Sequence, residues 1–214
     1  MKLRILLSTA YFPPVQYVTK ALAGKVLVIE KHEHYSKQSY RNRCNISGAN
    51  GTQLLSVPVK KSHQQKNSVC EVLIDYDTPW QKTHWRAIES AYGKSPFFLY
   101  YKDDLEPFFN KEFTHLFDFN NRIFDCVKQL IGLNTEILFT DNYVADPDDS
   151  EDLREIIHPK VAINTDPYFI PVPYYQVFAT KHGFLPNLSI LDLIFNEGPQ
   201  ALPILMQCYT GPAI

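Results

Sequence analysis

Apolar and helical patterns alternate along the first thirty residues. Residues 3–8 and 25–30 are short apolar runs rich in residue types that favour β-strands. Between them, residues 15–24 (VQYVTKALAG) carry apolar positions at helical spacing and end at Gly24, a residue type that commonly terminates helices. The pattern therefore predicts a β-α-β unit at the start of the chain.

The next apolar segments have the pattern of a β-hairpin. The sequences RCNIS (residues 43–47) and TQLLSVPV (residues 52–59) flank GANG (residues 48–51), which is typical of a tight turn. A further β-rich run, CEVLIDY (residues 70–76), predicts one more strand.

Helical periodicity dominates the middle of the chain. Residues 80–92 place apolar or aromatic side chains on one face, and residues 116–131 repeat this pattern before a stop at Gly132. The segment TEILFT (residues 135–140) then predicts a strand. Together, the segments predict an α/β fold with a mixed sheet, a β-hairpin and flanking helices, in a single domain covering residues 1–214.

A helix with a buried stripe is predicted near the end of the chain. Ser189 stands at its start, Gly198 at its stop, and Ser189 and Asp192 are expected to bind the free amides of the first turn. The expected core side chains have the spacing of one helical face; they are Leu188, Leu191, Ile194 and Phe195. Most of this closing segment is therefore expected to have a scaffolding role.

Residues 141–186 differ from the rest of the chain. They contain six prolines and an acidic patch formed by Asp146, Asp148, Asp149, Glu151, Asp152 and Glu155. These acids are clustered along the chain rather than placed at the ordered spacing of a calcium loop, so we expect a solvated surface in preference to a metal site. We interpret the segment as a long excursion from the single domain.

Composition limits the classes of partner. The chain has 214 residues and a formal net charge of −2, so no overall basic field favours general nucleic-acid binding. The four cysteines lack metal or disulfide spacing, which is typical of a cytoplasmic protein, and no apolar run is long enough for membrane insertion. Neither a GxGxxG nor a P-loop motif occurs, and we expect no cofactor.

Arg41 and Arg43 are candidates for binding an anion. On an extended strand, two side chains at this spacing share one face and can present two guanidinium groups to one phosphate or carboxylate. A hairpin would bring Lys60 and Lys61 near them and add positive charge. The alternative is a solvent-facing edge strand whose charges discourage aggregation.

Histidines and aromatic residues supply further candidates. His84 shares a helical face with Trp80, and an apolar environment would keep it neutral and able to accept a proton. His182 and Asn187 precede the closing helix and could reach a cleft. Tyr11 could stack on a sugar. For His84 and Tyr11, a structural role in the core is the alternative interpretation.

Four segments of the sequence together resemble the WbqC-like proteins of bacteria over about residues 5–205. They are RNRCNI, LLSVPVKK, HWRAIESAYGKSPFF and HGFLPNLSILDLIFNEGP. The resemblance implies a biosynthetic transferase that acts on a sugar or sugar nucleotide in O-antigen or other surface polysaccharide synthesis. For some members of the family, transfer of an aminoacyl group such as glycine to an amino sugar has been proposed.

Taken together, His84 and His182 are the candidate catalytic residues, and the candidate substrate-binding residues are Arg41, Arg43, Tyr11, Lys60 and Asn187; the resemblance, which includes the Arg-Asn-Arg triplet, favours a functional role for the two arginines. The expected partner is a small phosphorylated or sugar-nucleotide ligand. The alternative function is a non-enzymatic accessory protein that binds a sugar nucleotide or a protein partner in the same pathway.

Overall fold

The computed structural model describes residues 4–23, 26–61, 67–147 and 150–211. Four strands form one wholly parallel sheet in the order β5-β2-β1-β6. Their bounds are β1 Arg4–Ser8, β2 Val26–Glu30, β5 Glu136–Phe139 and β6 Ser150–Asp152. Helix α1 (Val15–Ala23) connects β1 to β2, so the predicted β-α-β opening is confirmed. Gly24, the predicted end of α1, lies outside the described residues.

Because both faces of a parallel sheet are covered, its two central strands carry uninterrupted apolar runs, residues 5–7 of β1 and 26–29 of β2. Ile5 and Leu7 of β1 and Leu27 and Ile29 of β2 point to one face and join the main core. Helices α1 and α5 (Leu116–Ile131) pack on this face. Tyr17 of α1 and Phe124 of α5 pack edge to face, with their ring centroids 5.6 Å apart.

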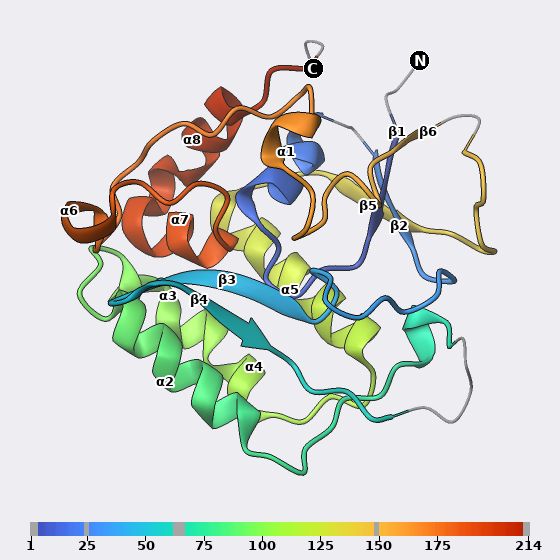
Figure 1. Cartoon of the computed structure of the whole chain (residues 1–214), viewed down its shortest axis with the longest axis horizontal. Helices are drawn as coiled ribbons and strands as arrows, with labels where there is room; N and C mark the ends of the chain where they lie inside the picture. The colour runs from blue at the N-terminus through green and yellow to red at the C-terminus, as the bar shows by residue number, and fades with distance from the viewer. Residues whose placement is uncertain (1–3, 24–25, 62–66, 148–149, 212–214) are drawn as a thin grey trace.

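The hairpin forms a second sheet of its own (Figure 1). Strand β3 (Arg43–Gly48) pairs antiparallel with β4 (Gly51–Ser56), as the turn sequence predicted. It lies between α7 (Ile190–Glu197) on one side and α2 (Trp80–Tyr92) on the other. The predicted parallel and antiparallel strands are therefore in separate sheets of one α/β domain.

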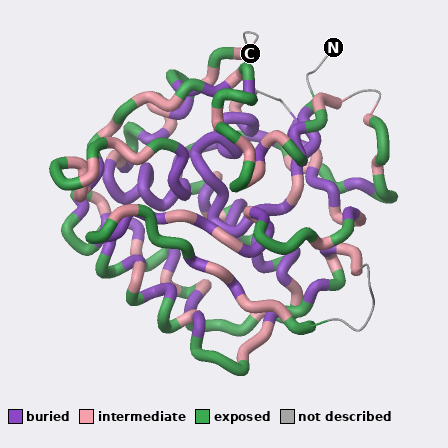
Figure 2. The backbone as a smooth tube through the Cα atoms, in the orientation of Figure 1, coloured by how far each residue is buried: buried purple, intermediate pink, exposed green. Residues whose placement is uncertain are grey.

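The remaining helices complete the layers around the hairpin and the sheet. They are α3 Phe98–Leu105, α4 Pro107–Asn110, α6 Ala179–His182 and α8 Ala201–Cys208. Short 3-10 turns occupy Val69–Glu71, Ile163–Thr165 and Gly198–Gln200. Buried residues are concentrated where β1, α1, α7 and the hairpin meet (Figure 2).

Several predictions are confirmed at the level of single elements. Helix α2 has the predicted bounds, and α5 ends at Gly132, which has a left-handed φ of 71°. In the closing segment Leu191 and Phe195 are buried, and Ser189 caps α7 by accepting from the Leu191 amide.

Other predictions were wrong. The segment CEVLIDY is not a strand: it begins in a 3-10 turn and then makes only isolated bridges. Asp192 does not cap α7, because its carboxylate accepts from Tyr174 and Gln176 in the interior. Part of the excursion is also integral to the fold, since β6 pairs with β1. Of its acidic patch, Asp148 and Asp149 lie outside the described residues.

Candidate functional site

The strand order defines a reversal point at β1. The chain passes from β1 to β2 and β5 on one side and then returns to place β6 on the other side of β1. In open parallel sheets, ligands bind in the crevice outside the carboxyl ends of the strands at such a reversal. The ends of β1 and β6 are therefore the place where the fold favours a site.

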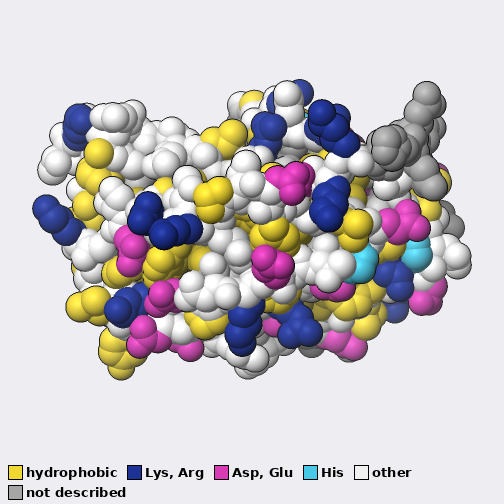
Figure 3. Space-filling view, turned by 90° about the horizontal axis from the view of Figure 1, so that it is seen from below, with side chains coloured by type: hydrophobic (Ala, Val, Ile, Leu, Met, Phe, Trp, Pro, Cys, Tyr) yellow, Lys and Arg dark blue, Asp and Glu magenta, His cyan; other side chains and the backbone are white. Residues whose placement is uncertain are grey.

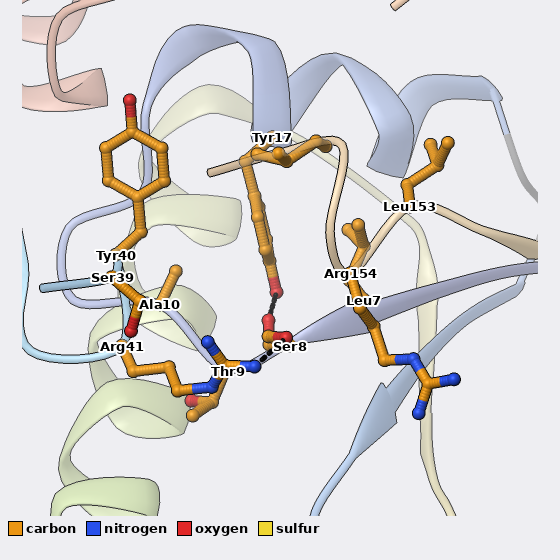
Figure 4. A pocket seen from close by; sticks show the side chains of 11 residues that line it. Leu7, Ser8, Thr9, Ala10, Tyr17, Ser39, Tyr40, Arg41, Leu153 and Arg154 are labelled. Carbon is orange, nitrogen blue, oxygen red and sulfur yellow. Dashed lines mark hydrogen bonds between the residues drawn. The ribbon is translucent and has the colours of Figure 1, made fainter. Parts of the chain in front are cut away.

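A pocket occupies this position (Figure 4). Its walls come from residues 7–10 at the end of β1, Tyr17 of α1, residues 39–41, and Leu153, Arg154 and Ile157 after β6. The space between them is about 250 Å³ when the part open to solvent is included, and the inner part has room for about one water molecule. The pocket therefore admits a small group rather than a whole nucleotide.

Arg41 forms the charged side of the pocket. Its Nε and Nη2 donate to the two carboxylate oxygens of Glu33 at 2.8 and 2.5 Å, and both side chains are buried. Ser8 Oγ accepts from Arg41 Nη2 at 2.8 Å and donates to Glu33 at 3.0 Å. Tyr17 fixes the end of β1 by donating its hydroxyl to the Ser8 carbonyl. The result is a rigid arrangement with paired charges.

A second charged cluster lies next to the pocket. The Arg154 guanidinium turns away from Ser8 and Arg41 (Figure 4) and donates to Asp152 at 2.9 and 2.6 Å. It also lies 3.7 Å from Glu30 and 5.5 Å from the ring centroid of Tyr143. Hydrogen bonds from Arg154 hold the pKa of Asp152 below its ordinary value, against the effect of burial. Arg154 therefore supports the pocket wall, while its charge is engaged outside the pocket.

The structure separates the two arginines that the sequence grouped together. The prediction of one extended Arg-x-Arg segment was wrong, because β3 begins at Arg43 and Arg41 lies in the turn before it. Arg43 is half-buried and does not line the pocket. Lys60 is exposed beyond the paired part of the hairpin, where its amide donates to the Leu73 carbonyl. Anion binding by Arg43 and Lys60 stays a prediction.

His84 and Tyr11 lie together in the aromatic core. The Tyr11 hydroxyl is 2.9 Å from His84 Nδ1, and the Tyr11 ring stacks on Phe119 at 5.7 Å. Burial lowers the pKa of His84 to about 4, although a hydrogen bond to the Ser56 backbone acts in the opposite direction. His84 is thus neutral at pH 7, as predicted, but it does not line the pocket. Its catalytic role stays a prediction, as does ligand binding by Tyr11.

His182 and Asn187 make contacts within the protein. His182 Nε2 lies 3.0 Å from the Ala49 carbonyl in the hairpin turn. Asn187, with a positive φ of 55°, accepts from the Gln16 amide and donates to the Gln16 side chain. It therefore caps the first turn of α1 from a distant part of the chain. Neither residue lines the pocket, and their roles in a reaction stay predictions.

Four polar residues around the pocket were not among the sequence candidates: Ser8, Thr9, Glu33 and Arg154. Ser8 and Thr9 directly follow an apolar strand, and Glu33 comes soon after the next one, so the carboxyl-end rule could have found them. Arg154 carried no such signal, because β6 has no apolar pattern. Among the described residues, no group of three or more His, Cys, Asp or Glu is arranged to hold a metal ion.

The surface agrees with the near-zero net charge. On the face shown in Figure 3, acidic and basic side chains are interspersed and no continuous basic area is formed by the described residues. Within the described part of the chain, no helix combines the length and apolar character needed to cross a bilayer.

Comparisons with known proteins give the family. The sequence profile of the WbqC-like protein family matches residues 9–171, which is more than half of the chain. The chain belongs to the WbqC-like protein family. The matched range includes Thr9, Glu33, Arg41 and Arg154 and begins just after Ser8. The predicted family is thereby confirmed over residues 9–171, and the closing segment from residue 182 lies outside the matched range.

The chain is also similar to an uncharacterized protein of Mycobacterium tuberculosis. The two are 27% identical over 230 residues, which cover 97% of this chain and 99% of the relative. No solved structure matches the chain.

Proposed function

We propose that this chain is a biosynthetic transferase that acts on a sugar or sugar-nucleotide acceptor in the synthesis of a bacterial surface polysaccharide. The observation that carries the proposal is the pocket at the carboxyl ends of β1 and β6, where Arg41 and Ser8 form a polar wall and Glu33, behind the wall, binds both of them. Membership of the WbqC-like family supports the biosynthetic context. We assign the activity to the cytoplasm, where sugar nucleotides are made.

The proposed reaction is a direct transfer, with an aminoacyl group such as glycyl as the form to be tested. The acceptor's neutral amine attacks the activated carbonyl carbon of the donor, the bond to the leaving group breaks, and the amine proton passes to a base. Glu33 is the carboxylate that contacts the pocket wall through Ser8 and Arg41. We therefore propose Glu33 as the proton acceptor in this reaction.

A non-enzymatic accessory protein that binds a sugar nucleotide is the second candidate. Its specific support is that neither predicted catalytic histidine, His84 or His182, lines the pocket. Binding without chemistry would need the polar wall but no base. The two candidates differ in whether a donor and an acceptor are converted after they bind.

A ligand screen followed by an activity assay tests the proposal. Nucleotide sugars and aminoacyl donors are added singly and in pairs, and the melting temperature is measured, because a ligand that binds only the folded state raises it. Arg41→Lys keeps the charge but loses the paired guanidinium geometry, and Arg122→Lys, on an exposed position of α5, is the matched control.

We expect a nucleotide sugar to raise the melting temperature of the wild-type protein and of Arg122→Lys but not of Arg41→Lys. Mass spectrometry of donor and acceptor mixtures then reports product. Binding without product would favour the accessory protein, and the absence of any stabilising nucleotide sugar would refute both candidates.

A further inference from the structure

The parallel sheet has two edge strands of opposite character. At one edge, β6 contains the charged residues Glu151 and Asp152. Charged side chains are a common protection of an edge strand against pairing with another chain. At the other edge, β5 has the sequence Glu-Ile-Leu-Phe and carries neither a charge nor a proline after Glu136. The β5 edge is therefore the less protected of the two.

The backbone of β5 has free groups on its outer side. The Thr140 amide donates to the Ile29 carbonyl of β2 at 3.2 Å, and the backbone groups of successive residues in a strand point in alternate directions. The amides and carbonyls of Ile137 and Phe139 therefore point away from β2. Among the described residues, none of these groups has a hydrogen-bond partner. Such a row of unpaired groups matches the backbone of another extended strand.

The side chains of β5 leave apolar surface beside these groups. Leu138 is 38% exposed and Phe139 is 44% exposed, whereas the neighbouring strand β2 is mostly buried. Phe139 keeps this exposure although its ring packs on Phe117 of α5, with the centroids 5.6 Å apart. A strand placed along β5 would therefore bury apolar area in addition to pairing the backbone.

The pattern of β5 fits a second copy of the same strand. In an antiparallel pair with a two-fold axis at Leu138, Ile137 faces Phe139 of the second copy, and all the free backbone groups of both strands are paired. Glu136 then lies opposite Thr140 of the second copy, so no like charges face each other. With the axis at Ile137 or Phe139 instead, one of the free residues would face a position outside β5.

From these observations we infer that the chain forms a dimer through β5, in which an antiparallel β5–β5 pair joins two parallel sheets into one. The contact is short, so we expect a transient dimer of the class that buries less than about 1,200 Å². The pocket lies at β1 and β6, and β6 is the opposite edge of the sheet, so the pocket stays open in this dimer. The inference therefore does not rest on the proposed function.

Disulfide trapping of the full chain tests the pairing and its register. Two residues that face each other in a non-hydrogen-bonded antiparallel pair have Cα atoms about 4.5 Å apart, which is within the range for a disulfide. We therefore expect Leu138→Cys to form a covalent dimer under mild oxidation. Glu136→Cys, at an exposed position of the same strand, is the matched control, because its counterpart lies four residues along the pair, about 13 Å away. The wild-type protein, with its free cysteines, gives the background.

Analytical ultracentrifugation measures the association without a covalent link. The wild-type protein is expected to show a dimer fraction that grows with protein concentration. Leu138→Lys places two like charges opposite each other at the axis and should weaken association by on the order of tenfold. Leu99→Lys, at a position of α3 that is 75% exposed, is the matched control and should associate as the wild type does. Melting temperatures of both variants verify that each is folded.

Three results would overturn the inference. The first is cross-linking of Leu138→Cys that is no faster than that of Glu136→Cys, which would indicate random collision. The second is a wild-type protein that stays monomeric at the highest concentration reached, which would leave the β5 edge open or for a different protein. The third is equal weakening of the dimer by Leu138→Lys and Leu99→Lys, which would place the contact elsewhere. If Leu138→Lys fails to fold, the comparison of the two cysteine variants still decides the question.

Discussion

Asp192 should make the stability of this protein depend on pH in a specific way. The side chain is fully buried in α7 and accepts from Tyr174 at 2.7 Å and from Gln176 at 2.8 Å, and no cation pairs with it among the described residues. Burial raises its pKa to about 6, although hydrogen bonds from Tyr174, Gln176 and Tyr92 oppose the effect. The folded protein therefore favours the protonated carboxyl.

The sign and size of the effect follow from this raised pKa. Below about pH 4 the carboxyl is protonated in both states, and the folded state has its full advantage. As pH rises from about 4 to about 6, the carboxyl ionises in the unfolded state while the buried one stays protonated, so the advantage of the folded state is progressively lost. The pKa lies roughly two pH units above the ordinary value of 3.8, which corresponds to about 3 kcal/mol in the free energy of unfolding.

The variant Asp192→Asn isolates this contribution. Its amide oxygen can keep the hydrogen bonds from Tyr174 and Gln176, and it carries no charge at any pH. Urea unfolding of both proteins is measured from pH 4 to pH 7.5, and the free energy of the wild type is subtracted from that of the variant. We expect this difference to rise by about 3 kcal/mol between pH 4 and pH 7, whatever its absolute value.

Tyr174→Phe provides a second test, because it keeps the ionisable group and should enlarge the pH dependence that Asp192→Asn removes. It removes a hydrogen bond that stabilises the carboxylate, so the pKa of Asp192 should rise further and the loss of stability should extend above pH 6. A difference between wild type and Asp192→Asn that stays constant across this pH range would refute the reasoning. It would mean that Asp192 titrates alike in the folded and unfolded states.

Two further predictions concern the closing segment. Leu191→Ala should lower the free energy of unfolding by roughly 2–5 kcal/mol without selectively changing ligand affinity, because Leu191 is 1% exposed; specific loss of binding in a stable variant would contradict its scaffolding role. Asn187→Ala should cost about 1–3 kcal/mol, because it removes the cap on Gln16 at a position with positive φ, whereas Asn187→Asp keeps the acceptor and should cost less. Thermal unfolding of both variants, followed by ligand titration, decides whether Asn187 acts through stability or through binding.

The sequence within each segment was sufficient to predict the helices and strands that have a regular apolar pattern. Helices α2 and α5 follow from apolar residues that repeat every three to four positions, and the end of α5 follows from the conformational freedom of Gly132. Strands β1 and β2 follow from short apolar runs, and the hairpin follows from its turn residues. In each case the signal lies within the segment itself, so no knowledge of distant residues was needed.

The tertiary structure alone decided the elements whose partners are far away in the chain. Strand β6 is acidic and only three residues long, and it is a strand because β1 offers it a free parallel edge. CEVLIDY has the composition of a strand but has no strand that pairs along its length, so it forms a 3-10 turn and isolated bridges instead. The family resemblance, carried by short motifs, could be recognised without any of these contacts.

The candidate site likewise depends partly on local sequence and partly on contacts between distant residues. The sequence indicated that Arg41 is an important charged residue, but it could not reveal that Glu33 neutralises it, because this depends on how the turn after β2 folds back. Ser8, Thr9 and Arg154 come from segments up to 146 residues apart. They meet only because parallel strands place their carboxyl ends along one edge of the sheet. The sequence by itself thus determined which residues can do chemistry, and the parallel pairing of β1 with β6 decided which of them share a pocket.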